Sequence, residues 1–474
     1  MKCKNILLIV LLLAILASGV YLVWRWQRSQ PPRNIILISI DALRADHLGC
    51  YGYVRETSPN IDRFAAQSTR FTRYFTVVPK TLPSMVTFFT GKQVNRHGVV
   101  SNWETLPAST TTLAACLPQG FRKAAFVNNV TLYRKTGLNR GFDVYNVLPQ
   151  LRPRAFANRV LNWLGRFVYT TSDTPLFLWI HFQDPHGPYK PAPEFTERFV
   201  NDTFYDGSKR VPIEPPPGEK HRNYVVGMVP KYQVLGDHDE VDYYIAQYDA
   251  EIYGVDREVG RILDFLDRRG LLNNSLVIVT ADHGESLGEN NYYFEHGWFL
   301  DEGSIRIPFM LFHPSLQPST CDQLADNSDF LPTVLELMHL PIPTGLDGVS
   351  LAPLLHGREA APKSHVFCQN ALEYGDLQQA IRSRDAIYLV RQSLRWLGNR
   401  SHETIGEPGY FYHTVGDGTR SQKNIYPSLS PEKKQQLQSL LSAFTGDMQQ
   451  TPAIAPEEVD ADTLNELKSL GYIE

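Results

Sequence analysis

Short, continuous apolar runs separated by longer amphipathic segments constrain the fold of this chain most strongly. Runs of this kind fit strands that are buried on both faces of a sheet. Strands that alternate with helical segments are typical of a mostly parallel central sheet with helices on both faces. We therefore predict an α/β fold whose central strands are Ile35–Ile40, Ala124–Val127, Leu176–His181, Leu276–Thr280 and Phe309–Phe312.

The pattern changes after about residue 363. A long helix is predicted before that point, over Asp242–Leu266, because apolar residues recur there at helical spacing. Beyond it, short alternating segments predict a few antiparallel strands, and a helix follows over Pro431–Phe444. We therefore expect a main domain over residues 34–363 and a small C-terminal α+β subdomain with a tail over residues 364–474.

The N-terminal region, residues 1–33, carries a continuous apolar stretch over Ile6–Trp24, flanked by lysines and arginines. Its length is enough to span a bilayer. A cleaved signal peptide is the alternative, since residues 14–18 include small side chains, but the apolar run continues past them. We expect an uncleaved single-pass anchor. No second apolar stretch of that length follows, so the rest of the chain is expected on one side of the membrane, outside the cytoplasm.

Composition argues against nucleic acid as a partner. The formal net charge is −4 and no basic cluster accumulates along the chain. The five cysteines are far apart and show neither a CxxC motif nor zinc-like spacing. A disulfide framework is therefore not expected.

Four polar residues stand where predicted strands end or where a loop enters a helix. Asp41 follows the first strand, Asp282 and His283 follow the fourth, and Thr81 precedes a helical stretch that stops at Gly91. The carboxyl ends of parallel strands share one edge of a sheet, where ligands bind. Two carboxylates, an imidazole and a hydroxyl suit one divalent cation, either Mn, Ca, Mg or Zn. We predict a metal site, with Thr81 as both ligand and nucleophile; a plain cap of the helix that follows is the other interpretation of Thr81, and both can hold.

Two further histidines are candidates for catalysis. His186 lies in a loop with two prolines and a glycine, directly after the strand that ends at His181. An imidazole there is suited to protonate a leaving oxygen. His296 follows the Asp282-His283 pair at loop distance and is predicted to contact the substrate. A structural hydrogen bond is the alternative for both.

At these residues the chain resembles the sulfatase family of the alkaline phosphatase superfamily. Asn34–Tyr53 looks like the opening segment of that family, and Thr81-Leu82-Pro83-Ser84 looks like its nucleophile segment. Asp184–Tyr189, Tyr248–Glu251 and Thr280–Glu285 continue the match in order. The resemblance implies an alkaline-phosphatase-like fold and a metal-dependent sulfuric or phosphoric ester hydrolase, with residues 34–363 as its catalytic domain.

The chain also departs from the family pattern. Where sulfatases resemble one another in a Cys or Ser within C/S-x-P-x-R, this chain has Thr81, and Met85 replaces the arginine. Oxidation of threonine would give a ketone, so the usual aldehyde hydrate is not available. Ala42 stands in place of a second carboxylate, and His283 where many sulfatases have Asn. The resulting set is similar to that of threonine-dependent phosphotransferases of the superfamily, such as lipoteichoic acid synthase.

These features together predict a membrane-anchored, metal-dependent hydrolase of sulfate or phosphate esters in which the Thr81 nucleophile favours phosphoesters. The first alternative is transfer of a phosphate-linked head group to a lipid or glycan. The second is a non-catalytic, sulfatase-like binding protein.

Overall fold

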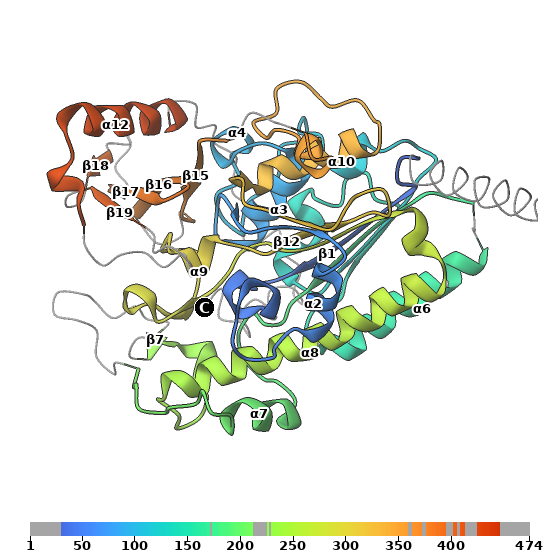
Figure 1. Cartoon of the computed structure of the whole chain (residues 1–474), viewed down its shortest axis with the longest axis horizontal. Helices are drawn as coiled ribbons and strands as arrows, with labels where there is room; N and C mark the ends of the chain where they lie inside the picture. Colours follow the sequence, from blue (N-terminus) through green and yellow to red (C-terminus); the bar gives the residue numbers. More distant parts are fainter. Residues whose placement is uncertain are drawn as a thin grey trace, which may run out of the picture.

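The central element of the structure, a computed structural model, is an eight-stranded sheet with helices on both faces (Figure 1). The structure describes residues 30–170, 173–211, 225–226, 229–358, 363–371, 376–394, 402–404, 408–412 and 424–445. Across the sheet the strands are β13 (Ser319–Cys321), β2 (Thr69–Phe71), β12 (Phe309–Phe312), β9 (Ser275–Ala281), β1 (Asn34–Ile40), β6 (Leu176–Phe182), β4 (Arg122–Val127) and β5 (Val144–Val147).

The sheet is mostly parallel, which confirms the predicted fold class. The neighbours β9, β1, β6, β4 and β5 run parallel, whereas β12 pairs antiparallel with both β9 and β2. Every residue of β1, β6 and β9 is buried, as their continuous apolar sequences require. The short strands β2, β5 and β13 were not predicted, because they are only partly apolar.

Helices cover the sheet from two sides. The long α8 (Val241–Arg268), which confirms the helix predicted over Asp242–Leu266, packs with α6 (Pro153–Thr170) and α2 (Pro59–Ala65) on one face. On the other face lie α3 (Thr81–Thr90) and α10 (Phe330–Leu337), which contact each other (Figure 1). Thr81, the predicted nucleophile and the first residue of α3, therefore lies on the face of the sheet opposite α8.

A second, antiparallel sheet follows near the C-terminus. Its strands are β15 (His365–Gln369), β16 (Asp376–Ser383), β17 (Ala386–Leu394), β18 (His402–Thr404) and β19 (Gly409–Tyr412). One face packs against α12 (Pro431–Thr445), with Ile381 and Tyr388 against Leu437 and Leu441. The opposite face packs against Phe75, Val77 and Val78 of the main domain. The predicted domain boundary at residues 363 and 364 stays a prediction.

The predicted membrane anchor falls almost entirely outside the described residues, as does the tail beyond residue 445. Within the described ranges, no helix combines the length and the apolar character needed to cross a bilayer. The anchor at residues 1–33 therefore remains a prediction.

A largely buried ion pair holds Lys363, just before the C-terminal sheet, against the start of α10, and its removal should destabilise the fold. Lys363 Nζ lies 2.6 Å from Asp326 Oδ2 and 2.8 Å from Asp329 Oδ1, beside the start of α10. Lys363→Met would leave two buried carboxylates without their cation, so we expect the free energy of unfolding to fall by about 3–5 kcal/mol.

Chemical denaturation would measure this loss. Arg63→Met is the matched control, because the ion pair of Arg63 with Asp264 is exposed. Its effect should stay within about 1 kcal/mol. Equal effects of the two variants would contradict a structural role for the Lys363 pair.

Candidate active site

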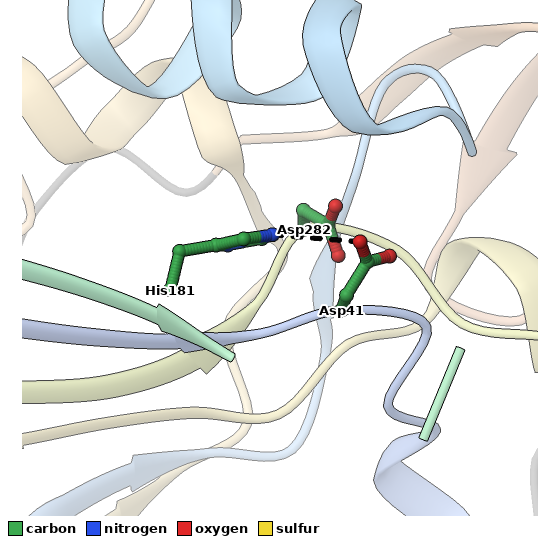
Figure 2. Close-up of side chains that lie close together, drawn as sticks. All are labelled: Asp41, His181 and Asp282. Atoms are coloured by element: carbon green, nitrogen blue, oxygen red, sulfur yellow. Dashed lines mark ion pairs between the residues drawn. The ribbon is translucent and has the colours of Figure 1, made fainter. Parts of the chain in front are cut away.

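The ends of three parallel strands bring Asp41, His181 and Asp282 together. The register pairs Ser39 with His181 and Ile40 with both Phe182 and Ala281, so Asp41 and Asp282 leave β1 and β9 at the same level. Figure 2 shows the three side chains pointing toward one another. All three are completely buried.

His283 and Thr81 lie in the same cluster. His283 Nε2 is 3.4 Å from Asp41 Oδ1, 3.5 Å from Asp282 Oδ2 and 3.3 Å from Thr81 Oγ1. His181 Nε2 is 3.4 Å from Asp41 Oδ2. The structure thus brings together the four residues that the sequence nominates as metal ligands, and it adds His181.

The donor atoms fit a cation. Asp41 Oδ1, Asp282 Oδ2 and His181 Nε2 are buried and have no hydrogen-bond partner. Burial of charged oxygens without partners is costly unless they pair or bind a metal. The distances of 3.3–3.5 Å from His283 Nε2 to Asp41 Oδ1, Asp282 Oδ2 and Thr81 Oγ1 are those of atoms that share one ion at about 2.0–2.2 Å. Carboxylate and imidazole donors suit a divalent ion such as zinc or manganese.

The other oxygen of each carboxylate is held by the protein. Asp282 Oδ1 accepts hydrogen bonds from the backbone N–H groups of Ala42, at 3.3 Å, and His283, at 2.8 Å. Asp41 accepts one at Oδ2 from the Asn129 amide. Ala42 has a positive φ of 54°, and its carbonyl accepts a hydrogen bond from the Tyr248 hydroxyl at 2.6 Å. In each carboxylate, one oxygen is therefore held by hydrogen bonds, and the other faces His283 Nε2 at the centre of the cluster.

Hydrogen bonds at Nδ1 set the tautomers of the histidines. His283 Nδ1 lies 2.8 Å from the Gly284 carbonyl, and His186 Nδ1 lies 2.7 Å from the Gly187 carbonyl. A carbonyl oxygen can only accept, so Nδ1 carries the proton in both rings. His181 Nδ1 lies 2.8 Å from Ser39 Oγ, which also accepts from the indole N–H of Trp179. In the His283 ring, Nε2 is then unprotonated and can bind a metal.

Thr81 is the first residue of α3, and Lys80 occupies the N-cap position. The predicted additional role of Thr81 as the N-cap residue is therefore wrong, whereas its role as nucleophile stays a prediction. The N–H of Leu82 donates to Asn102 Oδ1 at 2.9 Å, and Ser84 Oγ donates to the Asp282 carbonyl at 2.6 Å. These bonds hold the helix start, and with it the Thr81 hydroxyl, against the carboxylate cluster.

His186 and His296 lie beside His283. The His296 ring stacks on His283 with centroids 4.1 Å apart and meets His186 edge-on at 4.9 Å. His296 Nδ1 is 3.0 Å from Glu285 Oε1, whose other oxygen accepts from the Tyr189 hydroxyl at 3.3 Å. A side chain on Gly284 would meet the Gly303 carbonyl at 1.8 Å, so this tight loop requires glycine. The catalytic roles of His186 and His296 stay predictions.

Burial and mutual charge shift the ionisation of this cluster. Burial lowers the pKa of His283 to about 4, so its ring is neutral at neutral pH. Burial, followed by repulsion from Asp41, raises the pKa of Asp282 well above its usual value. For Asp41 burial acts in the same direction, but His186, His181 and His283 outweigh it and lower its pKa. The cluster thus carries anionic charge at Asp41 beside neutral imidazole nitrogen.

Sequence reasoning assigned no role to three residues of this site, His181, Asn129 and Glu285. The sequence identifies His181 only as a strand-end residue, and the β1–β6 register brings it to Asp41. Asn129 follows β4 as part of an Asn-Asn pair at a strand end, which is a usable signal. Glu285 is the last residue of the Asp282–Glu285 segment. Its side chain contacts His296 Nδ1, and the sequence does not reveal this contact.

Substitution of His181 would test whether it is a fifth ligand. We expect His181→Gln to weaken the binding of Mn²⁺ or Zn²⁺ roughly tenfold or more, because an unpartnered imidazole nitrogen leaves the cluster. Isothermal titration calorimetry would measure the affinity. His97→Gln is the control, since His97 is also buried but bonds to Thr87. An unchanged affinity in His181→Gln would exclude His181 from the ligand set.

Comparison with known proteins agrees with this geometry. The family model described as Sulfatase matches residues 33–340, more than half of the chain. An arylsulfatase of Clostridium perfringens is 24% identical over 441 residues, which cover 78% of this chain and 86% of that protein. The similarity thus extends over most of both chains.

Solved structures show the same fold. One, described as a complex with its substrate D-glucosamine-2-N,6-O-disulfate, aligns with a TM-score of 0.70 at 20% identity and covers 88% of this chain and 98% of its own. A phosphonate monoester hydrolase from Silicibacter pomeroyi aligns with a TM-score of 0.65 at 19% identity, covering 87% and 94%. The motif order, the sheet and the family match lead to one conclusion: this chain belongs to the sulfatase family and is an ester hydrolase of that family.

Proposed function

We propose that this hydrolase cleaves phosphate or sulfate esters through a covalent intermediate on Thr81, with phosphoesters preferred. The observation that carries the proposal is the Thr81 hydroxyl at the start of α3, 3.3 Å from the unprotonated Nε2 of the neutral His283 ring. A hydroxyl at that point of the donor cluster would be activated by a cation that the cluster holds, and can then act as a nucleophile.

Asp41, Thr81, Asp282 and His283 would hold one divalent cation in this proposal, with His181 as a further candidate ligand. The three unpartnered buried donor atoms support it. When bound, such an ion lowers the pKa of a coordinated hydroxyl and offsets negative charge on phosphoryl or sulfuryl oxygens.

The chain's own groups account for both halves of the reaction. Thr81 Oγ1 gives its proton to solvent water and attacks phosphorus or sulfur, and the bond from the phosphorus or sulfur to the alcohol oxygen breaks. His186, in its protonated form, gives its Nε2 proton to the leaving oxygen while Nδ1 stays bonded to the Gly187 carbonyl. A water molecule then attacks the phosphorus or sulfur of the Thr81 ester and gives one of its protons to His186. The bond from that phosphorus or sulfur to Thr81 Oγ1 breaks, and Thr81 Oγ1 takes back a proton from solvent water. His296, fixed by Glu285, orients the substrate oxygens.

The preference for phosphoesters follows from the nucleophile. A threonine ester has a single oxygen on its carbon, so release requires a second attack at phosphorus or sulfur. That double displacement is a common route for phosphoryl groups. The fold is compatible with both substrates, because the similar proteins include an arylsulfatase and a phosphonate monoester hydrolase.

A screen of aryl substrates would test the preference. We expect kcat/KM for aryl phosphate mono- or diesters to exceed that for the matching aryl sulfates by roughly tenfold or more, about 1.4 kcal/mol in transition-state stabilisation. The assay would include Mn²⁺, Zn²⁺, Ca²⁺ and Mg²⁺ in turn. Turnover of sulfates alone would contradict the phosphoester preference and leave the hydrolase assignment intact.

Transfer of a phosphate-linked head group to a lipid or glycan is the second candidate. A Thr81 ester can be resolved by an alcohol as well as by water, and the apolar stretch at residues 6–24 would hold the enzyme at a membrane surface. We propose, on the same sequence grounds, that the catalytic domain lies outside the cytoplasm.

A further inference from the structure

A cavity of about 280 Å³ lies where the starts of two helices meet the middle of a third. α6 and α7 (Pro193–Val200) both begin at its wall, and α8, against which both helices pack, forms another side (Figure 1). Asp184, in the loop that follows β6, also lines it. The residues that line it do not include any member of the metal cluster, so this cavity is separate from the active site. Its volume suits a small molecule.

The cavity wall contains a buried carboxylate oxygen without a partner. Glu251 of α8 is 3% exposed, and its Oε1 accepts a hydrogen bond from the Lys190 N–H at 2.5 Å. Its Oε2 has no hydrogen-bond partner among the described residues. A buried charged oxygen is costly unless a cation or a proton neutralises it. Because Glu251 lines the cavity, a ligand in the cavity can supply the missing partner.

Asp184 and Glu251 influence each other's ionisation. Burial raises the pKa of Asp184 to about 7, and burial followed by repulsion from Asp184 raises the pKa of Glu251 well above its usual value. At neutral pH the two carboxyl groups therefore hold at least one proton between them. The other titratable groups around this pair come from every neighbouring element: Arg152, Arg154, Tyr189, Lys190, Glu194, Arg257 and Glu258. A cationic group that enters the cavity would replace the shared proton.

The number of acceptor oxygens favours an ammonium group over a metal ion. Asp184 supplies two carboxylate oxygens and Glu251 supplies Oε2, and a primary ammonium group has three N–H donors for them. A calcium ion takes six to eight oxygen ligands, which is more than these two side chains offer.

The outer part of the cavity has the opposite charge. Arg152, Arg154 and Arg257 line it and are exposed, whereas Glu251 is buried. The N-termini of α6 and α7 lie at the same wall, and a helix N-terminus favours an anion. A ligand whose ammonium group contacts the buried acids would therefore carry an anionic group at its other end.

We propose that this cavity binds a small zwitterion, with its ammonium group between Asp184 and Glu251 and its anionic group beside the exposed arginines. The anionic group can be a carboxylate or a phosphonate, since arginine binds both. Asp184 and Lys190 flank His186 in one loop, and Lys190 is bonded to Glu251, so the site lies behind the loop that carries the predicted general acid. The proposal does not depend on the proposed function.

Glu258 supplies a matched control. It lies two turns after Glu251 on α8, lines the same cavity and is 7% exposed. Its Oε2, however, accepts a hydrogen bond from Arg261. Glu251→Gln and Glu258→Gln thus make the same change in the same cavity, but only the first removes the unpartnered oxygen. Gln has the shape of a protonated Glu, so both variants should fold.

Calorimetric titration of the whole chain would test the proposal with four probes that are not esters. β-Alanine and 2-aminoethylphosphonate carry both charges, ethylamine carries only the ammonium group, and propanoate carries only the anion. We expect at least one zwitterion to bind roughly tenfold more tightly than ethylamine, and propanoate not to bind. Glu251→Gln should weaken the binding of that zwitterion by roughly tenfold or more, and Glu258→Gln by less than about twofold.

Proton release gives a second measurement on wild type alone. Titrations in buffers of different ionisation enthalpy at neutral pH should show that about one proton leaves the protein for each zwitterion bound. Protons compete with the ammonium group for the same pair, so binding should weaken as the pH falls below about 7, where Asp184 becomes protonated.

Several outcomes would overturn the site. They are the absence of binding by every probe up to about 10 mM, equal affinities of the two variants, and binding without proton release. A zwitterion that binds no more tightly than ethylamine would overturn the role of the arginines. If Glu251→Gln failed to fold, Asp184→Asn would take its place, with the same loss expected. Because binding is measured without an ester, the result stands whether or not the chain cleaves phosphoesters.

Discussion

Thr81→Ala is expected to lower kcat/KM for a phosphoester by at least about a thousandfold, or roughly 4 kcal/mol in transition-state stabilisation. The reason is that no other hydroxyl is proposed to form the covalent bond to phosphorus. Asp41, Asp282 and His283 remain in place in this variant, so metal binding should weaken but persist. The decisive comparison is the turnover of 4-nitrophenyl phosphate by Thr81→Ala and by wild type. The metal content of both proteins should be determined in the same experiment.

Thr81→Ser is the control for this result. A primary hydroxyl keeps the nucleophile and its contact with His283 Nε2, so most activity should remain. Thr81 is completely buried at the start of α3, and both variants remove few atoms, so their melting temperatures should stay close to that of wild type. If Thr81→Ala turned over every cleaved substrate as fast as wild type, another nucleophile would have to act.

The central fold was predictable because its strands are buried on both faces. Ile35–Ile40 is apolar without interruption, and such a run has few alternatives to a central strand. The strands β2 and β13 could not be predicted in the same way. Thr69–Phe71 and Ser319–Cys321 are three residues each, partly exposed, and are set in place only by pairing across the sheet with residues far away in sequence.

The site was predictable in part for the same reason. Asp41 and Asp282 directly follow buried strands, so parallel pairing alone brings them to one edge. Contacts that depend on long-range register were out of reach. They include the approach of His181 to Asp41, the amide of Asn129 on Asp41, and the bond between Glu285 and His296.

The family match also decides one alternative that the residues alone left open. A non-catalytic binding protein was a possible reading of a sulfatase-like chain whose nucleophile is threonine. Membership in the sulfatase family and the close approach of Thr81 to His283 support an ester hydrolase instead. The experiments above test which residue is the nucleophile and which ester is the substrate.

Removal of divalent metal should abolish turnover and lower thermal stability together. Chelation would leave Asp41 Oδ1, Asp282 Oδ2 and His181 Nε2 buried without partners, a costly state for a pair of carboxyl groups in contact with one another. We expect activity to fall by about three orders of magnitude and to return on addition of Mn²⁺ or Zn²⁺. A metal present at a hundred times its Kd stabilises the fold by about 2.7 kcal/mol, which differential scanning fluorimetry would detect as a rise in melting temperature.

Asp41→Asn separates a specific site from a general effect of divalent ions. A neutral amide replaces the carboxylate whose pKa the surrounding histidines lower, so the variant should bind metal weakly and show no activity. In the metal-free state it should be less stable than wild type, because the histidines that lower the pKa of Asp41 stabilise its carboxylate in the folded protein. Its melting temperature should then not respond to Mn²⁺ or Zn²⁺. If metal raised the melting temperatures of Asp41→Asn and wild type equally, the stabilising ion would bind elsewhere, and the cluster at the ends of β1 and β9 would not be the metal site.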